Sequence, residues 1–203
     1  MKTKLILLLA LFGFAAAGFA NEPVKINFKM DVLEFVPGDK GYKRWEEKSK
    51  DATSADLPPG ASVMRLACVL SAKERKEALK EVAEKNHVVK MEGVIDEKDF
   101  EIAHSHALDP DLPRPPRLTN VSLEGSVTLS ADASTLDWDI YYKEKESTRI
   151  QSVRSRVSIF DGQTIVFTST KEGRIRVTMF TANIEKPDPQ PVMILDGPEK
   201  SKK

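Results

Sequence analysis

Residues 153–185 read VRSRVSIFDGQTIVFTSTKEGRIRVTMFTANIE, and this stretch decides how the rest of the chain is interpreted. It holds three β-rich runs separated by two turn signals. Asp161-Gly162 is the strongest short-range hairpin signal, because a type I′ turn needs positive φ at both central positions. Lys171-Glu172-Gly173 marks the second turn, where Gly173 can adopt the left-handed conformation. The stretch therefore predicts three consecutive antiparallel strands.

Residues 1–20 have the pattern of a cleaved signal peptide. Lys2 and Lys4 precede a short apolar run from Leu5 to Phe14, and small residues lead to Ala20. The run is shorter than the roughly 20 residues that a membrane-spanning helix needs, and no later segment approaches that length. We expect an exported chain, periplasmic or secreted, with no transmembrane segment after cleavage.

The composition of the mature chain limits the classes of partner that we expect it to bind. Without Lys2 and Lys4, 29 of the 31 basic residues remain against 31 acidic ones, a balance that gives no reason to expect nucleic acid as a partner. Cys68 is the only cysteine, so the chain forms no internal disulfide. It lies in an apolar run without a basic neighbour in sequence, which indicates a small buried side chain rather than a nucleophile.

Residues 21–108 are expected to form an N-terminal α+β lobe. Apolar residues alternate with polar ones from Val24 to Val32, as in a half-buried strand. The segment 42–51 allows one or two helical turns. A strand-helix-strand unit follows: strand 63–70, a helix that begins with the capping box of Ser71 and Glu74 and ends near Lys85, and strand 88–95. Asn86 is the expected left-handed cap of this helix.

Order is expected to weaken from Asp96 to Leu118, and the proline-rich segment 109–118 is predicted to be an extended connector. Residues 119–186 are expected to form an antiparallel β-domain of about five strands, and residues 187–203 a flexible tail. The predicted fold class is α+β and β-rich overall, a small β-α-β unit followed by an antiparallel meander. The last strand, 174–184, is apolar on both sides, so it either contains a bulge or is covered on both faces.

The β-domain resembles the carboxy-terminal β-domain of the bacterial secretin family. The resemblance rests on Gly125 to Leu129, on Asp161-Gly162-Gln163-Thr164 before an apolar strand, and on the final strand from Arg174 to Ile184. Secretins carry a glycine-rich gate between their last two strands, and here only 168–173 stands in that place. The resemblance implies an envelope protein that binds or assembles without forming a pore.

His104-Ser105-His106 with Asp109 is the best candidate for a metal site, since side chains at i and i+2 of an extended segment share a face. A polar loop before the connector explains the same residues, and we assign no metal and no cofactor. Asp137 and Asp139 share a strand face, as paired catalytic carboxylates would, but the solvent-exposed face of an amphipathic strand explains them much better.

Four arginines, Arg154, Arg156, Arg174 and Arg176, alternate on two strands and form a candidate patch for a protein partner or an anion. The other interpretation is that they pair with acidic residues across the sheet and protect its edges. We expect a protein without catalytic activity that binds a protein partner or self-associates. The alternatives are a monomeric ligand-binding β-domain with a pocket around Trp138, Tyr142 and Phe180, and a metal-dependent hydrolase that uses His104 and His106.

Overall fold

The computed structural model describes residues 25–50, 63–108, 117–130, 134–146, 149–171 and 173–185. The predicted signal peptide (1–20), the proline-rich residues 109–116 and the predicted tail (187–203) lie outside these ranges.

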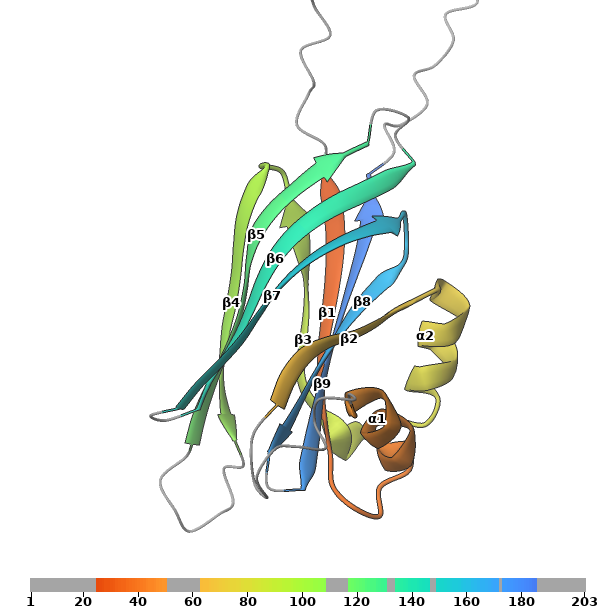
Figure 1. Ribbon diagram of the computed structural model, residues 1–203, viewed down its shortest axis with the longest axis vertical. Helices are drawn as coiled ribbons and strands as arrows, with labels where there is room; N and C mark the ends of the chain where they lie inside the picture. Colours follow the sequence, from red (N-terminus) through yellow and green to blue (C-terminus); the bar gives the residue numbers. More distant parts are fainter. Residues whose placement is uncertain are drawn as a thin grey trace, which may run out of the picture.

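The fold is α+β and rich in strand, with two antiparallel sheets packed face to face (Figure 1). Sheet A has five strands in the order β2-β8-β9-β1-β3, and sheet B has four in the order β4-β5-β6-β7. The strands are β1 (Ile26–Phe35), β2 (Val63–Leu70), β3 (His87–Ile95), β4 (Asp99–Leu108), β5 (Arg117–Leu129), β6 (Thr135–Glu146), β7 (Arg149–Phe160), β8 (Thr164–Lys171) and β9 (Arg174–Ile184).

Two helices lie on the outer side of sheet A, against β2, β8 and β9 (Figure 1). They are α1 (Tyr42–Ser49) and α2 (Ala72–Leu79), and a short 3-10 helix, η2 (Glu84–Asn86), precedes β3. The predicted capping box begins α2: the Ser71 hydroxyl accepts from the Glu74 N–H, and the Glu74 carboxylate accepts from the Ser71 N–H. The helix ends at Leu79 rather than near Lys85, and Asn86 belongs to η2 instead of capping α2.

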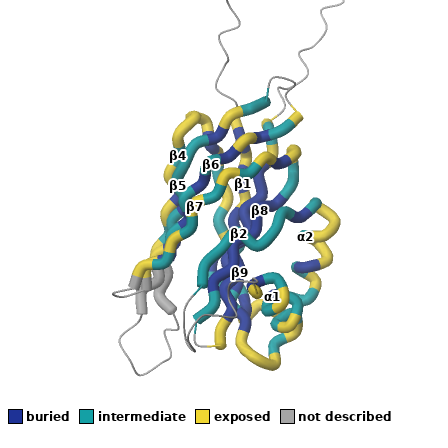
Figure 2. The backbone as a smooth tube through the Cα atoms, in the orientation of Figure 1, coloured by how far each residue is buried: buried dark blue, intermediate teal, exposed yellow. Residues whose placement is uncertain are grey.

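The main core lies between the two sheets and is filled with aromatic rings. Trp138 of sheet B meets Phe180 of sheet A edge to face, with 5.3 Å between ring centroids, and Tyr142 stacks on Phe167 at 4.9 Å. All four side chains are buried. A second core beneath the helices is centred on Trp45 and includes Phe35 and Met179. Because β8 and β9 take part in both cores, they are buried on both faces (Figure 2).

The predicted hairpin at Asp161-Gly162 is wrong, although the turn exists and Gly162 has the expected positive φ of 77°. β7 pairs with β6, whereas β8 pairs with β2 and β9, so this turn carries the chain from sheet B to sheet A. The turn bonds to β9: the Gly162 N–H donates to the Ala182 carbonyl, and the Asp161 carboxylate accepts from the Ile184 N–H. The second turn is a hairpin as predicted, with φ of 76° at Gly173.

The strand-helix-strand order of residues 63–95 is confirmed, but its two strands are not neighbours. β2 and β3 lie at opposite edges of sheet A, with β8, β9 and β1 between them. Sheet A thus combines strands from both of the segments expected to fold as lobe and β-domain, and the predicted five-stranded meander is divided between the sheets. β1 pairs with β9 over ten residue pairs without a register shift.

The expectation of weakened order from Asp96 onward is wrong for residues 99–108, which form β4. On its inward side only Phe100 and Ile102 are apolar before His104, which leaves too little alternation to indicate a strand. β4 pairs with β5 along its whole length. For the last strand, the choice between a bulge and double coverage is settled: β9 is regular and covered on both faces.

Candidate functional site

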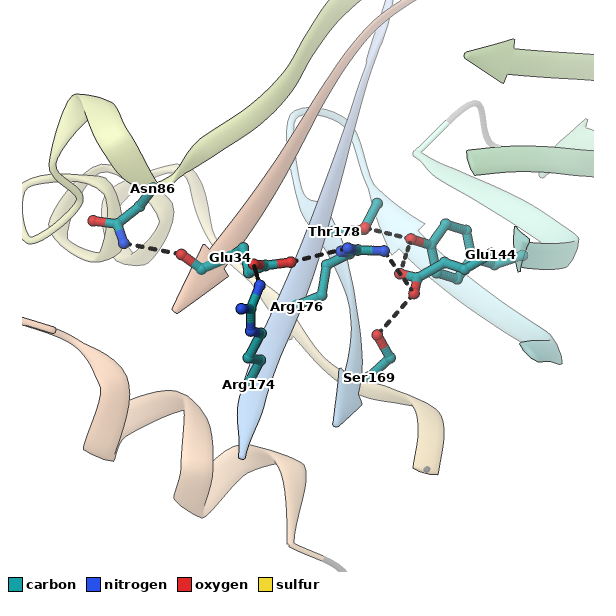
Figure 3. A network of polar contacts seen from close by, with 8 residues as sticks. Glu34, Asn86, Glu144, Ser169, Arg174, Arg176 and Thr178 are labelled. Atoms are coloured by element: carbon teal, nitrogen blue, oxygen red, sulfur yellow. Dashed lines mark hydrogen bonds and ion pairs between the residues drawn. The ribbon is translucent and has the colours of Figure 1, made fainter. Parts of the chain in front are cut away.

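Two regions gather charged side chains: a buried network between the sheets and the outer face of sheet B. The network starts at Glu144, which follows Trp138, Ile140 and Tyr142 on the inward face of β6. The Glu144 carboxylate accepts from the Ser169 hydroxyl at 2.9 Å and from Arg176 Nη1 at 3.3 Å (Figure 3). Ser169 and Arg176 belong to sheet A, so one carboxylate of sheet B is held by two strands of the opposite sheet.

Arg176 joins Glu144 to a second carboxylate. Its Nη2 donates to Glu34 Oε2 at 2.9 Å, and Arg174 donates to the other oxygen of Glu34 at 3.0 Å (Figure 3). The Arg176 side chain is 10 % exposed and that of Glu144 is 8 % exposed. Two carboxylates and two guanidinium groups balance in charge, which is how buried charges are tolerated.

Tyr142 closes the network on the core side. Its hydroxyl donates to Glu144 Oε1 at 2.6 Å and lies 2.6 Å from the Thr178 hydroxyl of β9. Burial, together with the adjacent Glu144 charge, raises the pKa of Tyr142 well above its usual 10, so the phenol is neutral. The network therefore ties the two sheets together with charge-balanced contacts, and we assign it to stability. Arg176 Nε is buried and has no hydrogen-bond partner among the described residues.

The outer face of sheet B is different, because nothing in the described part of the chain packs on it as α1 and α2 pack on sheet A. The strand registers place its outward side chains in rows across β4, β5, β6 and β7. One row is Asp99, Ser126, Asp139 and Arg156, and the next is Glu101, Glu124, Tyr141 and Arg154. Each row begins with an acid on β4 and ends with an arginine on β7.

The arginines of β7 share one carboxylate. Arg154 binds Asp139 through two hydrogen bonds of 2.9 Å, and Arg156 binds the same group at 3.1 Å. The hydrogen bond from Arg154 comes first among the causes that lower the pKa of Asp139 from 3.8 to about 2. Two cations on one anion leave a positive charge on β7.

An open depression of about 550 Å³ crosses this face. Its lining comes from all four strands and includes Asp99, Phe100, Glu101, Glu124, Gly125, Ser126, Asp139 and Arg154. Gly125 lets β5 and β6 approach there, since a Cβ at this position would lie 2.0 Å from the Asp139 carbonyl oxygen. The lining carries four carboxylates and one guanidinium. Asp139 is bound by the two arginines of β7 and Glu124 by Lys143, so the excess negative charge of the depression lies at Asp99 and Glu101.

The structure does not bring the four predicted arginines into one patch. Arg154 and Arg156 lie on the outer face of sheet B, whereas Arg176 is buried between the sheets and Arg174 lies beside it on sheet A. β7 and β9 belong to different sheets because the turn at Asp161 is not a hairpin. All four arginines pair with acidic residues, which is the other interpretation that the sequence left open.

For the metal candidates, Asp109 and the side chain of His106 lie outside the described residues. His104 is described, on β4, and is partly buried. Within the described ranges no three His, Cys, Asp or Glu side chains are grouped so that they could hold a metal ion.

Asp137 and Asp139 share the outer face of sheet B as expected, each with its own partner: the Ser158 hydroxyl contacts Asp137, and the β7 arginines bind Asp139. Cys68 is half-buried, and burial raises the pKa of its thiol. The residues that sequence reasoning missed are Glu34 and Glu144. Glu144 continues the inward alternation of Trp138, Ile140 and Tyr142, and that phase was the one signal of its position.

None of the helices in the described residues has the length and apolar character needed to cross a bilayer. Comparisons with protein-family models, with curated proteins and with solved structures found no match for this chain.

Proposed function

We propose that the mature chain is an exported, non-catalytic envelope protein that acts in binding or assembly through sheet B. The observation that carries this proposal is the unequal covering of the two sheets. Sheet A has the main core on one face and the helix layer on the other, whereas sheet B presents an outward face of charged side chains crossed by an open depression.

The interior supports a binding role on the surface rather than inside the sandwich. The expected interior pocket would be lined by Trp138, Tyr142 and Phe180. All three are buried in the main core, where each ring packs on an aromatic neighbour of the opposite sheet. The carboxylates of the network are likewise bound by side chains of sheet A. A partner would therefore meet the molecule at sheet B.

Photo-crosslinking in the producing cell tests this proposal. A photoreactive amino acid is placed at Ala103 on β4 or at Ser152 on β7, both exposed on the outer face of sheet B. The matched control positions are Lys73 and Lys76, exposed on α2. We expect discrete adducts from the sheet B positions only, and equal labelling from α2 would contradict the proposal.

Export is tested separately by the mass of the mature protein. Cleavage after Ala20 gives a chain that begins at Asn21 and is found in the periplasm or the medium. A cytoplasmic protein that retains residues 1–20 would contradict this part of the proposal.

A second candidate is a monomeric protein that binds a small cationic ligand, and the depression around Gly125 favours it. The resemblance to secretins remains a prediction. If the chain shares a common ancestor with secretins, we expect it to bind or assemble without forming a pore. β8 and β9, which carry most of the resemblance, pair here with β1 and β2 of sheet A.

A further inference from the structure

We propose that copies of this chain associate head to tail, with β7 of one copy pairing along β4 of the next to continue sheet B. This proposal deepens the proposed function, on which it rests, by naming a second copy of the same chain as the partner.

The two strands are the free edges of sheet B. β4 pairs only with β5, and β7 pairs only with β6, among the described strands. β2 passes close to β7 without pairing with it. Each edge is ten residues or longer, with backbone N–H and C=O groups that a further strand can satisfy.

The edges carry opposite charge on the same face. β4 presents Asp99 and Glu101, which make no hydrogen bond or ion pair with any described residue and are exposed. β7 presents Arg154 and Arg156, whose side chains are 70 % and 82 % exposed and which share only Asp139. An acidic edge and a basic edge on one sheet attract each other between copies and not within one.

The register follows from the rows already present in sheet B. Asp99 and Arg156 begin and end one row, and Glu101 and Arg154 begin and end the next. Continuing both rows into a neighbouring copy sets Arg156 opposite Asp99 and Arg154 opposite Glu101. In this register both arginines face an acid, and opposite charges in directly facing positions stabilise strand pairs.

The inward sides of the two edges also match in this register. Val153 comes to lie opposite Ile102 of the neighbouring copy, and Ser155 opposite Phe100. Val153 and Phe100 are partly buried residues packed on the main core, and Ile102 belongs to it. The pair of Val153 and Ile102 therefore continues the apolar interior across the junction, while the charged groups stay outside.

Pairing of two β7 edges is disfavoured. Two copies of β7 can pair in antiparallel fashion with the same side chains outward. In some registers, arginines of the two copies face each other, and like charges in facing positions destabilise strand pairs. In the other registers, Arg154 and Arg156 face no acid of the second copy. Because β4 and β7 run in opposite directions in sheet B, the head-to-tail pair is antiparallel while both copies keep one orientation. Such a contact is heterologous, and it leaves a free edge at each end for further copies.

Charge exchange between two variants tests the proposal. The first variant, Arg154→Glu with Arg156→Glu, has two acidic edges; the second, Asp99→Lys with Glu101→Lys, has two basic edges. The control is Glu84→Lys with Glu92→Lys, which makes the charge change of the second variant on η2 and β3, away from sheet B. The readout is the average mass by light scattering at rising concentration of mature protein, with thermal melts to confirm folding.

We expect the wild type and the control to at least double in mass at high concentration, and added salt to reverse the increase because it screens exposed charges. Each edge variant alone should stay monomeric, and an equimolar mixture should regain association. A wild type that stays monomeric, or a mixture that does not associate, overturns the proposal.

If the first variant fails to fold because Asp139 loses its partners, the second still decides the matter, since Asp99 and Glu101 make no hydrogen bond or ion pair with any described residue. Association of the second variant equal to that of the control would overturn the proposal. Adducts from Ala103 and Ser152 to a different protein, with a monomeric wild type, would remove the second copy as partner while leaving the proposed function in place.

Discussion

The carboxylate of Glu144 and the guanidinium of Arg176 form a 3.3 Å ion pair that joins the two sheets of the sandwich in a buried position. Glu144→Gln removes one charge and leaves Arg176 with Glu34 alone. We expect a loss of about 3 kcal/mol in the free energy of unfolding, at the lower end for a broken buried pair because one partner remains. Urea denaturation measures it.

The control for this change is Glu124→Gln, which breaks the Lys143–Glu124 pair, whose two side chains are about one-third exposed on the outer face of sheet B. It should cost less than about 1 kcal/mol, as exposed pairs do. Equal losses for the two variants would show that the Glu144 network does not hold the sheets together.

The pKa of Asp139 provides a second prediction. Arg154 and Arg156 lower it from 3.8 to about 2, so the pair stabilises the fold above pH 4, and this contribution is lost as the pH falls toward 2. Arg154→Gln removes the main cause, and the pKa of Asp139 should rise toward 3.8. A carbon-detected NMR titration of the Asp139 carboxyl measures it, and an unchanged pKa would contradict the hydrogen bonds between Arg154 and Asp139.

Gly125→Ala tests the close approach of β5 and β6. The added Cβ meets a backbone carbonyl at 2.0 Å, which no side-chain rotation relieves, so we expect a loss of about 3 kcal/mol. Gly38→Ala is the comparison. Gly38 has a φ of 97°, and a Cβ added there meets no heavy atom within 4 Å. Only the left-handed conformation is then unfavourable, by about 1 kcal/mol. A smaller loss at Gly125 than at Gly38 would contradict this contact.

Cys68 should react slowly with alkylating reagents in the native protein. Burial is the main cause that raises the pKa of its thiol, and this outweighs the nearby Lys48, so the reactive thiolate is scarce at neutral pH. Mass spectrometry of iodoacetamide labelling at pH 7, with and without denaturant, measures the difference. A native rate equal to the denatured rate would assign Cys68 to an accessible, activated site.

Local features of the fold could be predicted from the sequence because they depend on neighbouring residues. The capping box of Ser71 and Glu74, the positive φ of Gly162 and Gly173 and the alternation of β5 and β6 are all local. The partners of β8 were not predictable in this way. Asp161-Gly162 is compatible with a hairpin and with a step between sheets, and long-range contacts of β9 with β1 decide between them.

The charged residues show the same limit. The alternation of polar and apolar residues predicts that Asp139, Arg154 and Arg156 lie on an outward face. Pairing of these arginines with acids of a neighbouring strand is one of the two interpretations that the sequence allows. The network of Glu34, Glu144 and Arg176 joins residues that are far apart in the sequence, and only the pairing of the two sheets brings them together. The two edges of sheet B could be recognised only once β4 was known to be a strand.

The most direct test of sheet B as the interaction surface is the crosslinking yield at Ser152 relative to Lys76 in the producing cell. Our account predicts a discrete adduct at Ser152 that exceeds the yield at Lys76 several-fold. Equal yields, or an adduct confined to Lys76, would place the interaction on the helix layer and contradict the account.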